Sequence, residues 1–168
     1  FPELMPKIAI LNVGAEEIKG HDEIKKAYKF LKENKINDFE FMGYVEGNHI
    51  TEGEVNVIVT DGFTGNIALK TSEGTAKFIS SKLKDEFKKN IFTKIAGILS
   101  MKVLNSFKKV ADPRKYNGAS LLGLKGIIVK SHGGADSFAF NNSLKIALKE
   151  VNKDVPSCID KKLKEILG

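Results

Sequence analysis

Short apolar runs alternate with helical hydrophobic patterns along this chain, and this alternation restricts the fold more than any other feature. Runs that are apolar at consecutive positions suit strands covered on both faces, which occur mainly in parallel sheets packed between helices. Helical spacing predicts four helices. One is capped by Asp22, one begins at Ile67, one carries Phe140 and one begins at Pro156. Strands are expected at residues 8–11, 39–43, 55–59 and 127–129. The sequence therefore predicts an α/β fold with a mostly parallel sheet.

The composition fits one folded core. The chain has 168 residues, of which 42% are hydrophobic and 29% are charged, so we expect one compact domain or part of a larger one. The net charge is +6, and the lysines are spread out without interleaved aromatics, so nucleic acid is not suggested and phosphate-bearing or acidic partners fit equally well. The sequence contains no stretch of about 18 apolar residues, so no transmembrane helix is predicted. The start, Phe1-Pro2-Glu3, lacks an initiating methionine, so we expect a fragment.

Several common site motifs are absent. Cys158 is the single cysteine, which excludes an intrachain disulfide and suits a reducing cytosol. The three histidines fall in separate elements without ligand spacing, so no metal site is expected. Residues 118–123 have the glycine spacing of a Walker A loop, but Leu124 stands where that loop needs lysine. The glycine motifs of dinucleotide-binding proteins and serine hydrolases do not occur.

Polar, glycine-bearing turns follow three of the apolar runs, at residues 11–14, 60–62 and 130–134. Ligands of parallel α/β sheets bind at this edge, beyond the carboxyl ends of the strands. Residues 62–66 precede a helical pattern, where glycine N–H groups can cradle a phosphate; an ordinary tight turn is the alternative. Asp61 either belongs to that site or caps the following helix.

Residues 130–136, Lys-Ser-His-Gly-Gly-Ala-Asp, form the sharpest chemical cluster. A lone lysine is usually solvated and a lone histidine usually structural, but here a cation, a hydroxyl, an imidazole and a carboxylate gather at the end of one expected strand. The carboxyl ends of parallel strands share one edge of a sheet. We therefore expect residues 62–66 and 130–136 to converge on one phosphate.

Several motifs together resemble one known family. Residues 59–66, 69–74, 116–123 and 130–133 with Asp136 occur in the order seen in phosphate acyltransferases of the PlsX type, and residues 18–20 also fit. The resemblance runs from about Lys7 to Val151. Ser120 stands where proline is common in that family, and Gly134 stands where serine or asparagine is common. Residues 1–168 resemble only the carboxyl-terminal half of such an enzyme, so we expect the fragment alone to be inactive.

The resemblance implies an enzyme of bacterial phospholipid synthesis, located in the cytoplasm and attached peripherally to the membrane. Inorganic phosphate would attack the thioester of a fatty acyl group on acyl carrier protein and yield acyl phosphate. The implied fold is a three-layer α/β/α arrangement similar to phosphotransacetylases, and a homodimer is expected. No cofactor, metal or covalent nucleophile is needed, because the protein mainly positions the phosphate and stabilises the developing oxyanion.

We assign catalytic roles to Lys130, His132, Asp61 and Asp136, and phosphate binding to Gly62, Thr64, Gly65, Asn66, Ser131 and Gly133. In this hypothesis Lys130 and His132 bind the phosphate or the oxyanion. The two aspartates orient these cations or reach the substrate through water.

Two other function classes remain open. One is a phosphotransacetylase-like enzyme that uses coenzyme A thioesters, and the other is a non-catalytic fragment for dimerisation and carrier docking. Residues 88–109 mix apolar residues with lysines, a pattern that suits an anionic membrane surface. The same pattern also suits a helix pair packed on the core or on a dimer partner.

Overall fold

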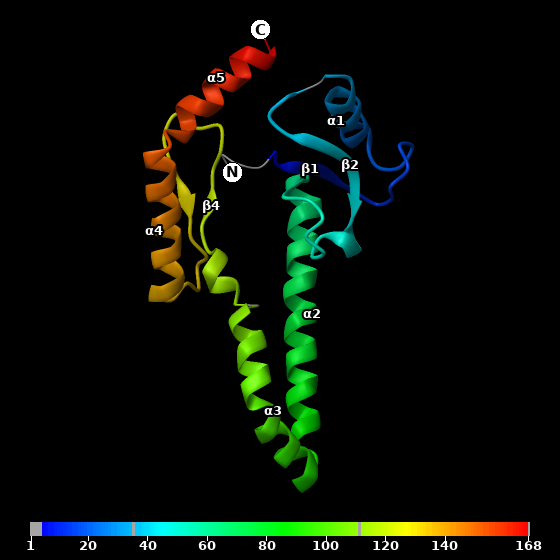
Figure 1. The fold of residues 1–168 in the computed structure, drawn as a ribbon, viewed down its shortest axis with the longest axis vertical. Helices are drawn as coiled ribbons and strands as arrows, with labels where there is room; N and C mark the ends of the chain where they lie inside the picture. Colours follow the sequence, from blue (N-terminus) through cyan, green and yellow to red (C-terminus); the bar gives the residue numbers. More distant parts are fainter. Residues whose placement is uncertain (1–4, 35, 111, 168) are drawn as a thin grey trace. The chain divides into compact units, whose positions relative to one another are not determined.

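The computed structural model describes residues 5–34, 36–110 and 112–167, and it confirms the α/β class (Figure 1). The chain forms two compact units, Phe1–Lys89 and Asn90–Gly168. Each unit has its own helices and its own small sheet. Within the described part of the chain, no helix is both long enough and apolar enough to cross a membrane.

The first unit contains the predicted parallel sheet. Its strands are β1 (Lys7–Asn12), β2 (Glu40–Glu46) and β3 (Val57–Val59), in the order β2-β1-β3. Both neighbours of β1 run parallel to it. The expected strands at 8–11, 39–43 and 55–59 are thus confirmed, with small shifts at their ends.

Helices cover both faces of the central strand. Ala9 and Leu11 point to one face and belong to the main apolar cluster, against which Ala68 of α2 (Gly62–Lys88) packs. Ile10 points to the other face, where its neighbour Tyr44 stacks on Tyr28 of α1 (Asp22–Glu33) with ring centroids 4.5 Å apart. Consecutive residues of β1 are therefore buried, as the continuous apolar run predicted. This gives helix, sheet and helix as three layers.

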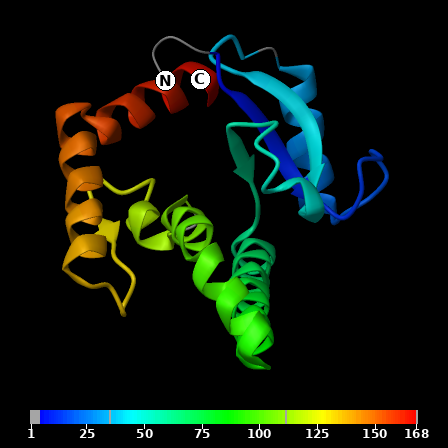
Figure 2. The same ribbon diagram turned by 60° about the horizontal axis from the view of Figure 1, so that its bottom comes forward.

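The second unit contains a short hairpin packed on a helix. Its elements in chain order are α3 (Ile91–Val110), η2 (Pro113–Tyr116), β4 (Ala119–Ser120), β5 (Val129–Lys130), α4 (Ser137–Asn152) and α5 (Val155–Leu167). Figure 2 shows α4 running beside the hairpin, in agreement with contacts from α4 to β5 and η2.

The expectation of a buried, parallel strand at residues 127–129 is wrong. β5 begins at Val129 and pairs antiparallel with β4. Gly123, at φ +80°, turns the chain back within the loop, and Ile128 is 51% exposed. Antiparallel pairing follows because a short loop joins neighbouring strands, whereas a parallel pair needs a long crossover.

Two helix starts also differ from the prediction. Asp22 lies in the first turn of α1, and His21 is the N-cap residue without a side-chain hydrogen bond. The negative charge of Asp22 still interacts favourably with the positive, amino-terminal end of the helix dipole. α2 begins at Gly62 instead of Ile67, because Asp61 already caps it there. The glycine-bearing segment 62–66 is therefore the first turn of a helix.

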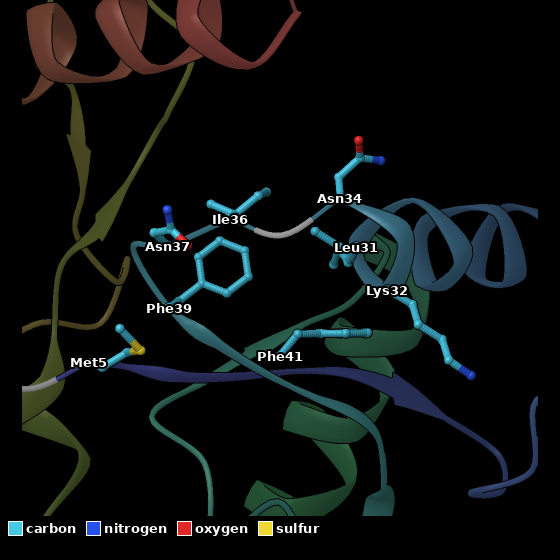
Figure 3. A pocket seen from close by; sticks show the side chains of 8 residues that line it. All are labelled: Met5, Leu31, Lys32, Asn34, Ile36, Asn37, Phe39 and Phe41. Atoms are coloured by element: carbon cyan, nitrogen blue, oxygen red, sulfur yellow. The ribbon is translucent and has the colours of Figure 1, made fainter.

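A cavity of about 270 Å³ opens in the first unit between the end of α1 and β2 (Figure 3). Leu31, Phe39 and Phe41 give it apolar walls, and Lys32 and Asn34 lie at its side. No residue assigned to a catalytic or phosphate-binding role lines this cavity.

Candidate functional site

The carboxylate of Asp61 caps α2. Its Oδ1 accepts hydrogen bonds from the backbone N–H groups of Phe63 at 2.9 Å and Thr64 at 2.8 Å. The Thr64 side chain and then its backbone N–H lower the pKa of Asp61, with a further contribution from Phe63. The alternative reading of Asp61 as a helix cap is thus confirmed.

This cap changes how residues 62–66 can meet an anion. The N–H groups of Phe63 and Thr64 are bonded to Asp61 Oδ1, and that of Gly65 is bonded to the Asp61 carbonyl oxygen at 3.0 Å. The N–H groups of Phe63 and Thr64 are donors that a free helix amino terminus would offer to phosphate, whereas the Gly65 N–H makes the first hydrogen bond within the helix. The assignments of Gly62, Thr64, Gly65 and Asn66 to phosphate binding stay predictions.

Gly65 is required by a close approach and not by its backbone angle. It has no positive φ, and a Cβ atom at this position would lie 2.5 Å from Cγ2 of Thr60. The strand-to-helix connection therefore passes directly over the first turn of α2.

In the second unit, Lys130 and His132 are exposed while Ser131 is half-buried between them. Side chains alternate in an extended segment, so Lys130 and His132 share the open side and Ser131 points inward. Within the described residues, the Lys130 ammonium has no ion pair or hydrogen bond. A cation and an imidazole are thus presented together at the end of β5.

The turn at residues 132–135 fixes the tautomer of His132. The Gly134 N–H donates to His132 Nδ1 at 3.0 Å, and the Ala135 N–H donates to the His132 carbonyl oxygen at 3.0 Å. Because Nδ1 acts as an acceptor, the proton of the neutral imidazole sits on Nε2. His132 therefore offers an Nε2–H donor to its surroundings.

Asp136 is tied to a residue that the sequence did not single out. Its Oδ1 caps α4 by accepting from the Ala139 N–H at 2.9 Å, and its Oδ2 accepts from Arg114 Nη1 at 2.7 Å. The Ala139 N–H first, and then Arg114, lower the pKa of Asp136. Asp112 and then Asp136 raise the pKa of Arg114. Asp136, the last residue of the 130–136 segment, is therefore bound to Arg114 of η2.

The assigned residues fall into two groups. Residues 61–66 lie in the first unit and residues 130–136 in the second, and each group is compact by itself. Their convergence on one phosphate stays a prediction. No cluster of histidine, cysteine or acidic side chains suited to a metal ion occurs in the described parts of either unit.

Comparison with known proteins places the chain in a family. Residues 4–158 match the family described as "Fatty acid synthesis protein". A phosphate acyltransferase from Alkalilimnicola ehrlichii and one from Methylococcus capsulatus are each 50% identical over 163 residues, which cover 97% of this chain and 47% of the relative. One from Pelagibacter ubique is 52% identical over 151 residues, covering 90% of this chain and 45% of the relative.

The fold is that of an α/β protein, and the chain belongs to the family described as "Fatty acid synthesis protein". The relatives carry the name phosphate acyltransferase, so the resemblance to the PlsX type is confirmed. The chain spans about half the length of these curated relatives.

Proposed function

We propose that this chain is part of an enzyme that transfers a fatty acyl group from acyl carrier protein to inorganic phosphate. The product is acyl phosphate, and its use is phospholipid synthesis. The names of the relatives support acyl transfer to phosphate. The observation that carries the proposal is the exposed pair Lys130 and His132, an unpaired cation beside an Nε2–H donor at the end of β5.

The chemistry of the pair suits this reaction. An oxygen of hydrogen phosphate attacks the thioester carbonyl carbon, and the carbonyl oxygen becomes an oxyanion. The carbon–sulfur bond then breaks as the carbonyl reforms, and the carrier thiolate takes up the proton that the phosphate loses. Lys130 supplies a point charge for a phosphate dianion, and His132 Nε2–H supplies a directed donor for phosphate or oxyanion. Charge-assisted hydrogen bonds of this kind contribute about 1.5–3 kcal/mol each. Preorganised donors stabilise the transition state because they need no rearrangement as charge develops.

Site-directed variants test the pair. The assays use a protein that contains residues 1–168 and has the full length of the relatives, here called the full-length protein. Lys130→Ala and His132→Ala should each lower kcat/KM for phosphate at least about tenfold, which corresponds to roughly 1.4 kcal/mol. The midpoint of thermal unfolding should stay near that of the parent, because both side chains are exposed. Lys125→Ala, at another exposed lysine of the same unit, is the matched control. Parental turnover in both site variants would contradict the proposal.

The acyl donor is tested with the same protein. Acyl carrier protein and coenzyme A, each loaded with the same fatty acyl group, are compared as substrates at equal concentration. Higher kcat/KM with the carrier thioester is the expected result. Preference for the coenzyme A thioester would instead support the phosphotransacetylase-like alternative, and binding of carrier without turnover would support a docking role.

We also propose that α3 attaches the protein to a membrane. Asn90 and Thr93 cap this helix reciprocally, and no described side chain on it is buried. Ile98 is 71% exposed and Leu99 is 78% exposed, with lysines along the same helix. Apolar side chains would enter the lipid boundary while lysines meet anionic headgroups.

Vesicle sedimentation separates the membrane from a second copy of the chain as the partner of α3. Replacing both Ile98 and Leu99 by Glu should abolish sedimentation with phosphatidylglycerol-containing vesicles. The control replaces Leu163 and Ile166 of α5 by Glu, which are also exposed. Sedimentation velocity measures the proposed homodimer in each variant. Unchanged vesicle binding together with loss of the dimer would assign α3 to the dimer interface.

A further inference from the structure

Asn117 is a buried side chain that joins the 130–136 segment to η2 and α4. Only 9% of the residue is exposed. Its Nδ2 donates to Ser131 Oγ at 2.9 Å and to the Ala139 carbonyl oxygen at 2.9 Å. Its Oδ1 accepts from the His132 backbone N–H at 2.9 Å. One amide group therefore contacts two consecutive residues of the candidate site.

The chemistry of the partners fixes the orientation of this amide. A backbone N–H can only donate and a backbone carbonyl can only accept, so Oδ1 must face His132 and Nδ2 must face Ala139. The second Nδ2 proton then goes to Ser131 Oγ, which leaves the Ser131 hydroxyl proton free to donate elsewhere. Asn117 serves both backbone partners at once: a carboxylate of the same size could not donate to the Ala139 carbonyl oxygen, and an apolar side chain could serve neither partner.

The backbone around Asn117 is shaped to bring it this close to α4. Gly118 follows at φ +119°, and a Cβ atom there would lie 2.9 Å from the Cα atom of Ser143. At the other end of the segment, Arg114 of η2 binds Asp136. Residues 112–117 thus anchor the 130–136 segment at both ends, and Asn117 is the anchor next to Lys130 and His132.

We propose that Asn117 is a positioning residue for the acyl transfer, an inference that rests on the proposed function. By binding the His132 N–H, it sets the direction in which the chain leaves β5 and enters the 132–135 turn. That direction places the imidazole under the Gly134 N–H, which selects the Nε2–H tautomer. Asn117 does not touch the substrate; it holds the donor that does.

The sharpest perturbation is Asn117→Asp, which keeps the shape of the side chain. One carboxylate oxygen still accepts from His132 N–H, but the other faces the Ala139 carbonyl oxygen and cannot donate to it or to Ser131. Asn117→Ala removes all three hydrogen bonds. It is the second variant, to be used if the buried carboxylate of Asn117→Asp prevents folding. Asn142→Asp is the matched control, because the Asn142 amide donates to the Arg114 carbonyl oxygen at 3.0 Å on the exposed side of the same unit.

Two readouts on the full-length protein report positioning without using turnover. Hydrogen exchange of the His132 backbone amide should rise at least about tenfold in Asn117→Ala and stay at the parental rate in Asn142→Asp. In protein labelled with ¹⁵N-histidine, the neutral His132 ring should change from the Nε2–H tautomer to a mixture. His132→Gln assigns the ring signals.

Kinetics then connect positioning to the reaction. At a temperature where circular dichroism shows every variant folded, both Asn117 variants should lower kcat at least about tenfold. The KM for the acyl thioester should stay within about twofold, because Asn117 makes no contact with that substrate in the proposal. Asn142→Asp should match the parent in both constants.

The outcomes separate this inference from the proposed function. Unchanged exchange and tautomer in both Asn117 variants overturn the inference whatever the kinetics show. Parental kcat in both Asn117 variants, alongside lost turnover in Lys130→Ala and His132→Ala, also overturns it and leaves the proposed function standing. Parental kcat in all of these variants overturns both.

Discussion

Replacement of Gly118 by alanine tests the packing that holds Asn117 in place. The backbone angle φ of +119° is one that side-chain-bearing residues rarely adopt, and such strain costs about 1–3 kcal/mol. The new Cβ would also lie 2.9 Å from Ile146 Cδ1 and 2.9 Å from Ser143 Cα. Overpacking of this kind costs another 1–3 kcal/mol or so, and the backbone of Ser143 cannot move aside without shifting α4.

The two terms together predict that Gly118→Ala lowers the free energy of unfolding by about 2–6 kcal/mol. Urea unfolding followed by far-ultraviolet circular dichroism on the full-length protein measures the change. Gly126→Ala is the matched control, because no atom lies within 4 Å of its added Cβ and its φ is not positive. A stability of Gly118→Ala equal to that of Gly126→Ala would refute the close packing of this segment on α4.

Three further predictions concern the first unit and the chain as a whole. Gly65→Ala should destabilise α2 through contact with Thr60 Cγ2, and Thr60→Ser, which removes that methyl group, should restore most of the loss in thermal unfolding. The pKa of Asp61 is lowered in the folded state, so its contribution to stability is present above its ordinary value of 3.8 and is lost as pH falls through the folded pKa. Asp61→Asn keeps a capping side chain, so its stability relative to the parent should rise on acidification; a constant difference between pH about 6 and 3 would contradict this. The 168-residue chain alone should form no acyl phosphate, and robust turnover by it would refute the need for further residues.

Local patterns predicted those parts of the fold that depend on local forces. The apolar run through Ala9 and Leu11 predicted β1 because burial on both faces needs apolar residues at every position. The start of α2 was predicted too late, although Asp61 before a helical pattern is a recognised cap signal. β5 was misjudged because its apolar run has the same composition in a parallel strand as in a hairpin. Only the turn at Gly123 and the pairing with β4 decide between them.

The candidate site was predicted in part. Residues 130–136 were selected from their chemistry, since a cation, a hydroxyl, an imidazole, two glycines and a carboxylate gather at one strand end. Asn117 and Arg114 were missed because their partners lie 14 to 22 residues away, and no periodicity links positions at that separation. The motif at residues 116–123 marked the stretch without giving Asn117 a role. The three hydrogen bonds of the Asn117 side chain depend on tertiary packing, which the motif alone does not specify.

The caps on two helices bear on where a phosphate charge can be held. Asp61 bonds the first N–H groups of α2, and Asp136 bonds the Ala139 N–H of α4. A carboxylate in that position uses the donors that phosphate would use, and its negative charge opposes a second anion at the same helix end. Lys130 carries the opposite charge and has no acidic partner among the described residues. We therefore expect a phosphate in the second unit to meet the Lys130 ammonium and the His132 Nε2–H donor at the end of β5 and not the α4 terminus, so removing either side chain should lower turnover directly.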